Sequence, residues 1–195
     1  MAPLLSLITA MLVFSYGPSG SLSCDLSQNH VQVNKESIVL LHQMQRISSF
    51  RCRKDRKNFG FPQEMVDGSQ VQEAQAISVL HEMLQETSNV FGSEHSSAAW
   101  NTTVLHGLLS RLHWQLEDLG TCLVLQMKEA ESALGMEAPT LAVKRYFQGI
   151  RLYLKEKQYS DCAWEIVRVE IKRAFSLSTN LREMLRNQDG DLRSP

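Results

Sequence analysis

The chain has 195 residues, 43% of them hydrophobic and 21% charged, which is enough to bury one sizeable core in a single domain. Its formal net charge of -1 argues against general nucleic-acid binding, which needs a clear basic excess. It contains only 5 prolines and 10 glycines, while Leu, Gln, Glu and Lys recur, so its composition favours helices over strands.

The N-terminal segment, residues 1–23, differs from the rest of the chain. None of these residues is Asp, Glu, Lys or Arg, and residues 4–14 are almost wholly apolar. This pattern is typical of a secretory signal peptide cleaved between Ser23 and Cys24. A membrane anchor needs roughly 18 or more apolar residues, and no run in the chain is that long. We therefore predict a secreted, soluble protein with a single helical domain, residues 24–195.

Apolar residues that recur every three or four positions predict five helices after this leader. The first two helices cover residues 34–47 and 71–91. The third begins near residue 97 and ends between residues 122 and 127. The fourth includes residues 143–154, and the fifth runs from residue 162 to about residue 186. The core-facing positions that define them are Ile38, Leu41, Met44 and Ile47; Ala76, Ile77, Leu80, Leu84 and Phe91; Leu105, Leu108, Leu112, Leu116, Leu119 and Leu123; Val143, Phe147, Ile150 and Leu154; and Ala163, Ile166, Val167, Ile171, Ala174 and Phe175. Gly92 is a plausible helix stop, and Ser160 can cap the last helix.

The connections between these helices predict how the helices run. The second and third helices, and the fourth and fifth, are joined by short links, so each pair is antiparallel. Residues 49–69 and 128–139 form longer connections, which can cross the bundle and leave the joined helices parallel. The result is an up-up-down-down bundle, the arrangement of helical cytokines. The 49–69 connection holds a charged run, Cys52 and the aromatic residues Phe59 and Phe61, so we expect it to be ordered. The polar tail, residues 187–195, is expected to fray.

The last helix carries two different faces. Opposite its apolar stripe lie Arg168, Lys172 and Arg173, with Val169 and Ser176 between them. An ordinary solvated surface would explain this basic face, because most charged helix faces contact only water. Contact with a partner protein would explain it as well, so the face is a candidate binding surface.

Four cysteines follow the leader: Cys24, Cys52, Cys122 and Cys162. An even number in a secreted chain indicates two disulfides, with three possible connectivities. The chain has no Cys-x-x-Cys pair, so zinc-knuckle and thioredoxin-like sites have little support. Asn101 begins an Asn-Thr-Thr acceptor for N-glycosylation, which fits the secretory route.

Motifs for catalysis and metal binding are missing from the sequence. His81 and Glu82 begin like a zincin motif, but Gln85 stands where the second histidine is needed. His106 and His113 lie about 10 Å apart along one helix, which is too far to share a metal ion unaided. The chain has no glycine-rich phosphate loop and no nucleophile elbow. We therefore expect neither an enzyme nor a cofactor.

Several motifs along the chain together resemble the type I interferons. They are Cys24-Asp25-Leu26, Phe61-Pro62-Gln63-Glu64, Val79-Leu80-His81-Glu82-Met83, Ser96-Ser97-Ala98-Ala99-Trp100, Tyr146-Phe147-Gln148, Tyr153-Leu154-Lys155-Glu156-Lys157 and Tyr159-Ser160-Asp161-Cys162-Ala163-Trp164-Glu165. The last motif is highly specific, and the match runs from the leader to the tail. The mature length, 195 − 23 = 172 residues, is similar to that of the omega branch, with interferon tau next.

The resemblance implies a long-chain cytokine bundle of five helices with two disulfides, Cys24–Cys122 and Cys52–Cys162. It also implies a secreted cytokine that binds the two-chain interferon alpha/beta receptor and activates signalling through Janus kinases and STAT proteins. Antiviral, antiproliferative and immunomodulatory responses are expected to follow. We expect a monomer that does not insert into a membrane.

In this family the high-affinity receptor chain contacts the first long loop and the last helix. The positions that match here are Arg53, Arg56, Arg168, Val169, Lys172, Arg173, Ser176 and Leu177. Arg53 departs from the family pattern, because a leucine usually stands beside the cysteine. We expect this departure to weaken or rearrange an apolar contact.

The family's low-affinity receptor chain contacts the opposite face, on the second, third and fourth helices. The positions that match here are Asn89, Val104, Leu109, His113 and Lys144. Ser88 replaces a phenylalanine that is common in the family, which sets this face apart from the usual pattern.

One hypothesis from a different functional class stays open at this point. The leucine-rich third helix could line a cavity in a secreted carrier of a small apolar ligand. This alternative predicts an unfilled core, whereas leucines packed against neighbouring helices favour the cytokine.

Overall fold

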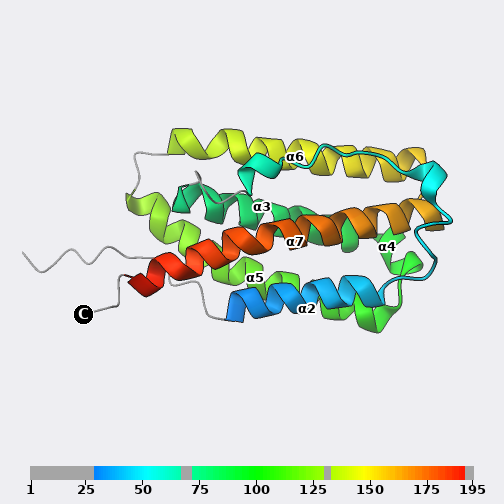
Figure 1. The fold of residues 1–195 in the computed structure, drawn as a ribbon, viewed down its shortest axis with the longest axis horizontal. Helices are drawn as coiled ribbons and strands as arrows, with labels where there is room; N and C mark the ends of the chain where they lie inside the picture. Colours follow the sequence, from blue (N-terminus) through cyan, green and yellow to red (C-terminus); the bar gives the residue numbers. More distant parts are fainter. Residues whose placement is uncertain (1–28, 67–71, 130–132, 192–195) are drawn as a thin grey trace, which may run out of the picture.

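The computed structural model describes residues 29–66, 72–129 and 133–191 (Figure 1). Within these ranges the chain is helical and has no strand, which confirms the predicted all-α fold. The elements are α2 (Asn29–Gln43), the 3-10 helices η1 (Arg53–Asp55) and η2 (Gln63–Met65), α3 (Glu73–Phe91), α4 (Glu94–Ala99), α5 (Thr102–Glu129), α6 (Ala133–Glu156) and α7 (Asp161–Asp191). The predicted leader and Cys24 lie outside the described residues.

Five long helices lie side by side along one axis (Figure 1). The C-terminal ends of α2, α3 and α6 meet the N-terminal ends of α5 and α7 at one end of the bundle. There, Arg46 lies 3.6 Å from Asp161 at the start of α7, and the ring centroids of Phe91 and Trp164 are 6.3 Å apart. Helices α2, α3, α5 and α7 therefore run up-up-down-down, the predicted type of bundle, and α6 is a fifth helix parallel to α3. The helix that runs parallel to α5 is α7, however, and not the helix that directly follows α5, as the predicted connections required.

The prediction of a long connection over residues 128–139 is wrong. Helix α5 continues to Glu129 and α6 already begins at Ala133, with Pro139 inside it. The link is short, so α5 and α6 are antiparallel rather than parallel. A proline inside a helix costs about 3 kcal/mol, and we attribute the survival of α6 through this position to its packing along α3.

Three further boundaries differ from the sequence prediction. Helix α2 covers residues 29–43 rather than 34–47. The loop expected before Ser97 contains the short helix α4, because the Ser93 side chain accepts a hydrogen bond from the Ser96 amide and caps it. Helix α7 continues to Asp191, past the expected start of fraying, since an existing helix gains one hydrogen bond per added residue even where side chains are polar.

The predicted apolar positions form one continuous core. Most are buried, and Ile38, Ile47, Leu116 and Leu123 are partly buried. Trp164 is only 2% exposed and packs at the end of the bundle where Phe91 and Trp100 contribute further rings. In α5 the four leucines most deeply placed belong to this same core cluster: Leu105, Leu108, Leu112 and Leu119. Because these leucines pack against other helices, the alternative of an apolar-ligand carrier is not favoured.

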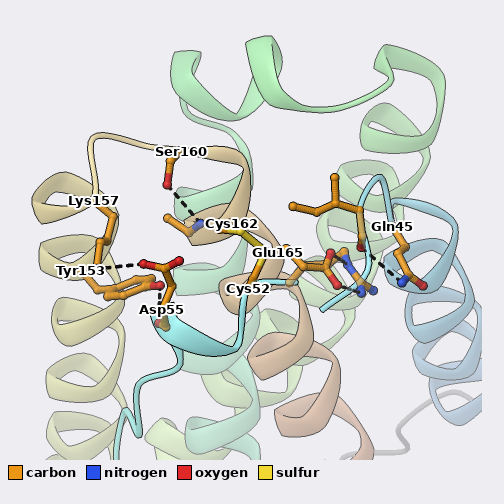
Figure 2. Close-up of a disulfide and its surroundings, with 11 residues drawn as sticks. Gln45, Cys52, Asp55, Tyr153, Lys157, Ser160, Cys162 and Glu165 are labelled. Atoms are coloured by element: carbon orange, nitrogen blue, oxygen red, sulfur yellow. Dashed lines mark hydrogen bonds and ion pairs between the residues drawn. A yellow bond between two sulfur atoms is a disulfide. The ribbon is translucent and has the colours of Figure 1, made fainter. Parts of the chain in front are cut away.

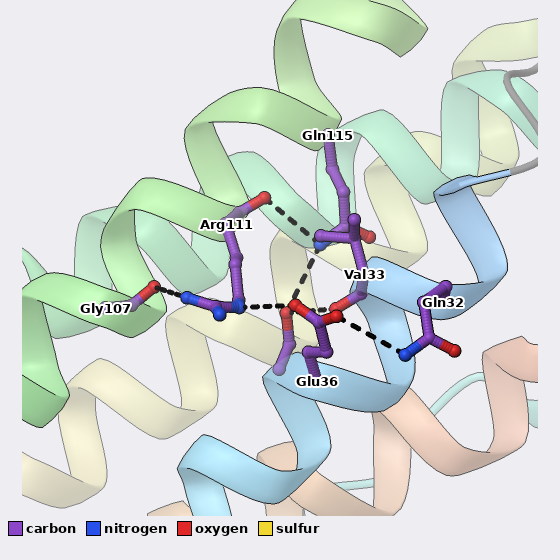
Figure 3. Close-up of polar contacts among 7 residues, drawn as sticks. Gln32, Val33, Glu36, Gly107, Arg111 and Gln115 are labelled. Atoms are coloured by element: carbon purple, nitrogen blue, oxygen red, sulfur yellow. Dashed lines mark hydrogen bonds and ion pairs between the residues drawn. The ribbon is translucent and has the colours of Figure 1, made fainter.

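Polar contacts join α2 to α5 along one side of the bundle (Figure 3). Arg111 of α5 donates from Nε to Glu36 Oε2 of α2 at 2.9 Å. The Nη1 atom of Arg111 donates to the backbone oxygen of Gly107, one turn earlier in α5, at 3.2 Å. Deeper between the helices, Gln115 Nε2 donates to Ser37 Oγ at 3.4 Å. Polar side chains therefore join α2 to α5 at these positions, in place of apolar packing.

A buried basic pair lies between the start of α2 and the later half of α7. His30 Nδ1 is 3.5 Å from Nη1 of Arg182, and both side chains are almost completely buried. Burial, followed by the nearby charge of Arg182, lowers the pKa of His30 from 6.5 to about 3. Burial also lowers the pKa of Arg182 to about 9. His30 is therefore neutral in the folded protein at any pH above this low value.

We expect this pair to make the fold sensitive to acid. Below a pH of about 6.5, His30 takes up a proton in the unfolded chain but not in the folded protein. The contribution of neutral His30 to the free energy of unfolding is therefore complete above that pH and is lost as the pH falls toward 3. Between pH 7 and 4 the loss should be about 3 kcal/mol. Urea unfolding followed by circular dichroism at both values should show a smaller pH difference for His30→Gln. An equal difference in the variant would contradict this assignment.

Candidate functional site

The first long connection is held against the bundle at residues 48–57, which we call the anchored loop. The Cys52–Cys162 disulfide joins it to the first turn of α7 (Figure 2). Tyr153 Oη of α6 donates to the backbone oxygen of Asp55 at 2.7 Å, and Lys157 Nζ lies 3.1 Å from the Asp55 carboxylate. These contacts confirm both the predicted order of this connection and the Cys52–Cys162 pairing that the resemblance implied.

Aromatic contacts fasten the rest of the connection along α6. Phe59 packs edge-on against Tyr153, and Phe61 packs edge-on against Tyr146, each pair with ring centroids 5.2 Å apart. Burial and then the charge of Asp55 raise the pKa of Tyr153 to about 12. Burial and then the charge of Glu170 raise the pKa of Tyr146 far above its ordinary value. Both phenols therefore keep their protons at neutral pH and act as hydrogen-bond donors.

The exposed side of the anchored loop carries arginines and one aromatic ring. Arg53 and Arg56 are exposed. Phe50 is 64% exposed, and the guanidinium carbon of Arg53 lies 4.5 Å from its ring centroid. Our sequence analysis missed Phe50, although an exposed aromatic beside a charged, cysteine-anchored segment is a usable signal. Arg53 therefore makes a cation–π contact with Phe50, whereas a leucine at this position would offer only an apolar side chain.

On α7 the predicted positions begin two turns after the disulfide that holds the anchored loop. The disulfide fixes the loop at Cys162, and Val169 is seven residues further on, about 10 Å along the helix. Val169, Arg173 and Ser176 are exposed, and Lys172 and Leu177 are partly buried. We call the combined surface the loop–α7 face; it consists of Arg53, Arg56, Val169, Lys172, Arg173, Ser176 and Leu177.

The prediction that Arg168 belongs to this exposed basic face is wrong. Arg168 is only 3% exposed. Its Nε and Nη2 donate to the two carboxylate oxygens of Glu165 at 2.8 and 2.7 Å, and its Nη1 donates to the Leu41 backbone oxygen at 2.8 Å. The Leu41 carbonyl is one of the last in α2 and has no partner further along that helix, so Arg168 completes the end of α2. It is a structural residue of the interior.

The positions assigned to the second face come from three other helices. Asn89 of α3 is exposed, and so are His113 of α5 and Lys144 of α6, while Val104 and Leu109 of α5 are partly buried. Lys144 Nζ lies 3.6 Å from Glu82 on α3, and His113 Nε2 lies 3.3 Å from Glu117. We call these five positions the α3–α5–α6 face. It shares no helix with the loop–α7 face.

Two other predicted modification sites have different outcomes. Asn101 is exposed, and its side-chain oxygen accepts hydrogen bonds from the amides of Thr103 and Val104 at 3.0 and 3.2 Å, which caps α5. Its glycosylation stays a prediction. Cys122 is buried in α5, but Cys24 lies outside the described residues, so the Cys24–Cys122 pairing also stays a prediction.

The described residues offer neither a metal-binding cluster nor a membrane-spanning helix. Among the described residues, no group of three or more His, Cys, Asp or Glu side chains is arranged to hold a metal ion. In the same part of the chain, every helix is too short or too polar to cross a bilayer.

Comparisons with known proteins agree with this architecture. Residues 26–185 match the family model "Interferon alpha/beta domain". Interferon omega-1 of Bos taurus is 63% identical over 195 residues, and interferon tau of Cervus elaphus is 56% identical over 195 residues, each covering 100% of both chains. Zebrafish interferon 2 has a similar structure, with a TM-score of 0.67 over 80% of this chain and 99% of that chain, at 21% identity. The solved structure supports the fold alone.

The greater similarity to interferon omega-1 of Bos taurus than to interferon tau of Cervus elaphus agrees with the order suggested by the mature length. Interferon omega-1 of Homo sapiens is 57% identical over 194 residues, again across 100% of both chains. The family model covers the whole described bundle up to the last turns of α7. The chain belongs to the interferon alpha/beta family, the type I interferons, which are cytokines and not enzymes.

Proposed function

We propose that this protein is a secreted interferon that bridges the two chains of the interferon alpha/beta receptor. Bridging would activate Janus kinases and STAT proteins and so produce antiviral, antiproliferative and immunomodulatory responses. The observation that supports this best is the anchored loop: Cys52–Cys162 holds it on the first turn of α7, beside the exposed side of that helix. Two separate exposed faces then remain available for two different receptor chains.

The loop–α7 face is proposed to bind the high-affinity receptor chain. It combines the exposed apolar side chain of Val169 with the cations Arg56 and Arg173. Arg173 Nη1 lies 3.8 Å from Glu170, a long and half-exposed ion pair that a receptor carboxylate can replace at little cost. Arginines in an interface can pair with carboxylates through two parallel hydrogen bonds and often contribute most of the binding energy.

The α3–α5–α6 face is proposed to bind the low-affinity receptor chain. Two of its members contact carboxylates: Lys144 lies beside Glu82 of α3, and His113 lies beside Glu117 of its own helix. The side chains of Lys144 and His113 are both largely exposed. Such partly solvated pairs contribute little to the fold, so their side chains can be exchanged for receptor contacts. Simultaneous binding at both faces, by a monomer, would bring the two receptor chains together.

Arg56→Ala and Arg173→Ala are each expected to weaken binding to the high-affinity chain by about 1–3 kcal/mol. Most of this loss should appear as faster dissociation, because interface mutations mainly change that rate. Surface plasmon resonance with the receptor ectodomain measures both rates, and thermal unfolding should be unchanged. Lys35→Ala, on the exposed side of α2, serves as the matched control.

Lys144→Ala should leave high-affinity binding intact and reduce signalling through the other chain. The opposite result, with Arg56 and Arg173 silent and Lys144 essential for the high-affinity chain, would mean that the two faces are exchanged. STAT phosphorylation in cells with and without the interferon alpha/beta receptor tests the proposed function itself. Equal phosphorylation in both cell lines would refute it.

A further inference from the structure

Residues 48–55 of the anchored loop form consecutive tight turns that end in the 3-10 helix η1. Backbone amides bond three residues back, from Arg51 to Ser48 at 2.9 Å, from Cys52 to Ser49 at 3.2 Å and from Asp55 to Cys52 at 2.9 Å. A 3-10 turn has three residues per turn, so side chains three positions apart lie above one another. The loop therefore presents three rows of side chains.

Two of these rows have partners within the protein. Cys52 and Asp55 form the inner row, because one is bridged to α7 and the other is paired with Lys157 at the end of α6 (Figure 2). Phe50 and Arg53 form the second row, as the guanidinium stacked on the ring shows directly. Arg56, the proposed receptor-binding position, directly follows η1, where the backbone becomes extended.

The third row consists of Arg51 and Lys54, which the proposed receptor-binding face does not use. Both side chains are exposed, and within the described residues neither lies within ion-pair distance of a carboxylate. Their spacing along the turn is about 6 Å. Lys57 lies just beyond the end of η1, 4.0 Å from Glu156, and both side chains are largely exposed, so this weak pair leaves the charge of Lys57 accessible.

We propose that the third row, Arg51 and Lys54, together with the neighbouring Lys57, binds a sulfated polysaccharide of the cell surface or extracellular matrix. Regularly spaced cations complement a linear polyanion, and each neutralised sulfate releases a bound counterion. The disulfide and the Tyr153 hydrogen bond already hold the backbone of the turn, so binding costs little ordering of the chain. The row has no exposed apolar side chain, which favours a polyanion over a protein, since protein interfaces usually have an apolar centre.

This inference rests on the extracellular location in the proposed function, and polysaccharide binding itself does not require a receptor chain. The protein's net charge of -1 gives no general attraction to polyanions, so binding must come from a local cluster. The row also lies next to Arg53 and Arg56 on the same short turn. A bound polysaccharide would therefore compete with the high-affinity receptor chain and hold the cytokine near the cell surface in a reservoir.

Surface plasmon resonance on immobilised heparin, over a series of salt concentrations, tests the proposal. The full mature protein should bind, and Arg51→Gln/Lys54→Gln should bind at least about tenfold more weakly, with a slope of log Kd against log salt smaller by about two. The control Lys35→Gln/Arg145→Gln removes two exposed cations from α2 and α6 and should change binding less than about threefold. Hyaluronate, which has carboxylates but no sulfates, should not bind.

Three outcomes would overturn the inference. The first is no binding of the unmodified protein to heparin at about 0.15 M salt. The second is an equal loss in the control variant, which would show an effect of net charge alone. The third is unchanged heparin binding with lost receptor binding in the Arg51/Lys54 variant, which would assign the row to the receptor. Failure on heparin with intact receptor-dependent STAT phosphorylation would refute this inference and leave the proposed function standing.

Discussion

Changing both Cys52 and Cys162 to serine is expected to lower the free energy of unfolding by about 4–5 kcal/mol. The bridge joins residues separated by 110 positions, and in the chain-entropy model closing a loop of this length restricts the unfolded chain by that amount. Urea unfolding followed by circular dichroism measures the loss. Tyr153→Phe is the matched control, because it removes only the hydrogen bond to Asp55 and should cost about 1 kcal/mol.

The same double variant also tests the link between this bridge and recognition. Without the bridge, the anchored loop keeps its contacts to Tyr153, Glu156 and Lys157 and loses its covalent attachment to α7. Binding to the high-affinity receptor chain should therefore weaken even under conditions where the variant is fully folded, although Arg56 and Arg173 are unchanged. A stability loss below 1 kcal/mol together with normal receptor binding would show that the bridge supports neither role.

Arg168→Ala is expected to destabilise the protein by about 3–5 kcal/mol, because it leaves the Glu165 carboxylate buried without its partner. The Leu41 carbonyl at the end of α2 also loses its donor. Thermal and urea unfolding measure this effect. In contrast, Arg173→Ala, five residues further along α7 on the exposed face, should change stability by no more than about 0.5 kcal/mol.

A paired replacement separates the cost of an unpaired charge from the value of the ion pair. Glu165→Leu combined with Arg168→Met removes both charges and keeps a similar volume, so it should recover most of the lost stability. Receptor affinity of the folded double variant should be close to that of the unmodified protein. If the double variant were stable and lost receptor binding, Arg168 would have to act in recognition despite its burial.

The difference between Arg168 and Arg173 shows how far sequence periodicity reaches. Helical spacing places both residues, with Lys172, away from the apolar stripe of α7. Spacing along one helix does not say which neighbouring element covers a given side. In the folded protein the end of α2 covers Arg168, and nothing comparable covers Arg173. A carboxylate three residues earlier, Glu165, was the one sequence signal that a buried pair was possible.

The connection between α5 and α6 shows the same limit for the backbone. A proline usually marks the edge of a helix, and this local rule led to a predicted loop over residues 128–139. The cost of one interior proline is small compared with the burial of a whole helix face, and α6 packs along α3 for much of its length. Local preference therefore lost to tertiary packing at Pro139.

By itself, the sequence determined the helical class, the positions of the core residues and the family. Each of these depends on patterns repeated along the whole chain: the three-to-four spacing of apolar residues, and motifs such as the one from Tyr159 to Glu165. Only the tertiary structure decided which charged residues are exposed, how α6 runs, and which rows of the anchored loop are free. These properties depend on contacts between segments far apart in sequence, such as Cys52 with Cys162 and Leu41 with Arg168. The burial of a polar group is set by the elements packed around it, and a local pattern does not contain them.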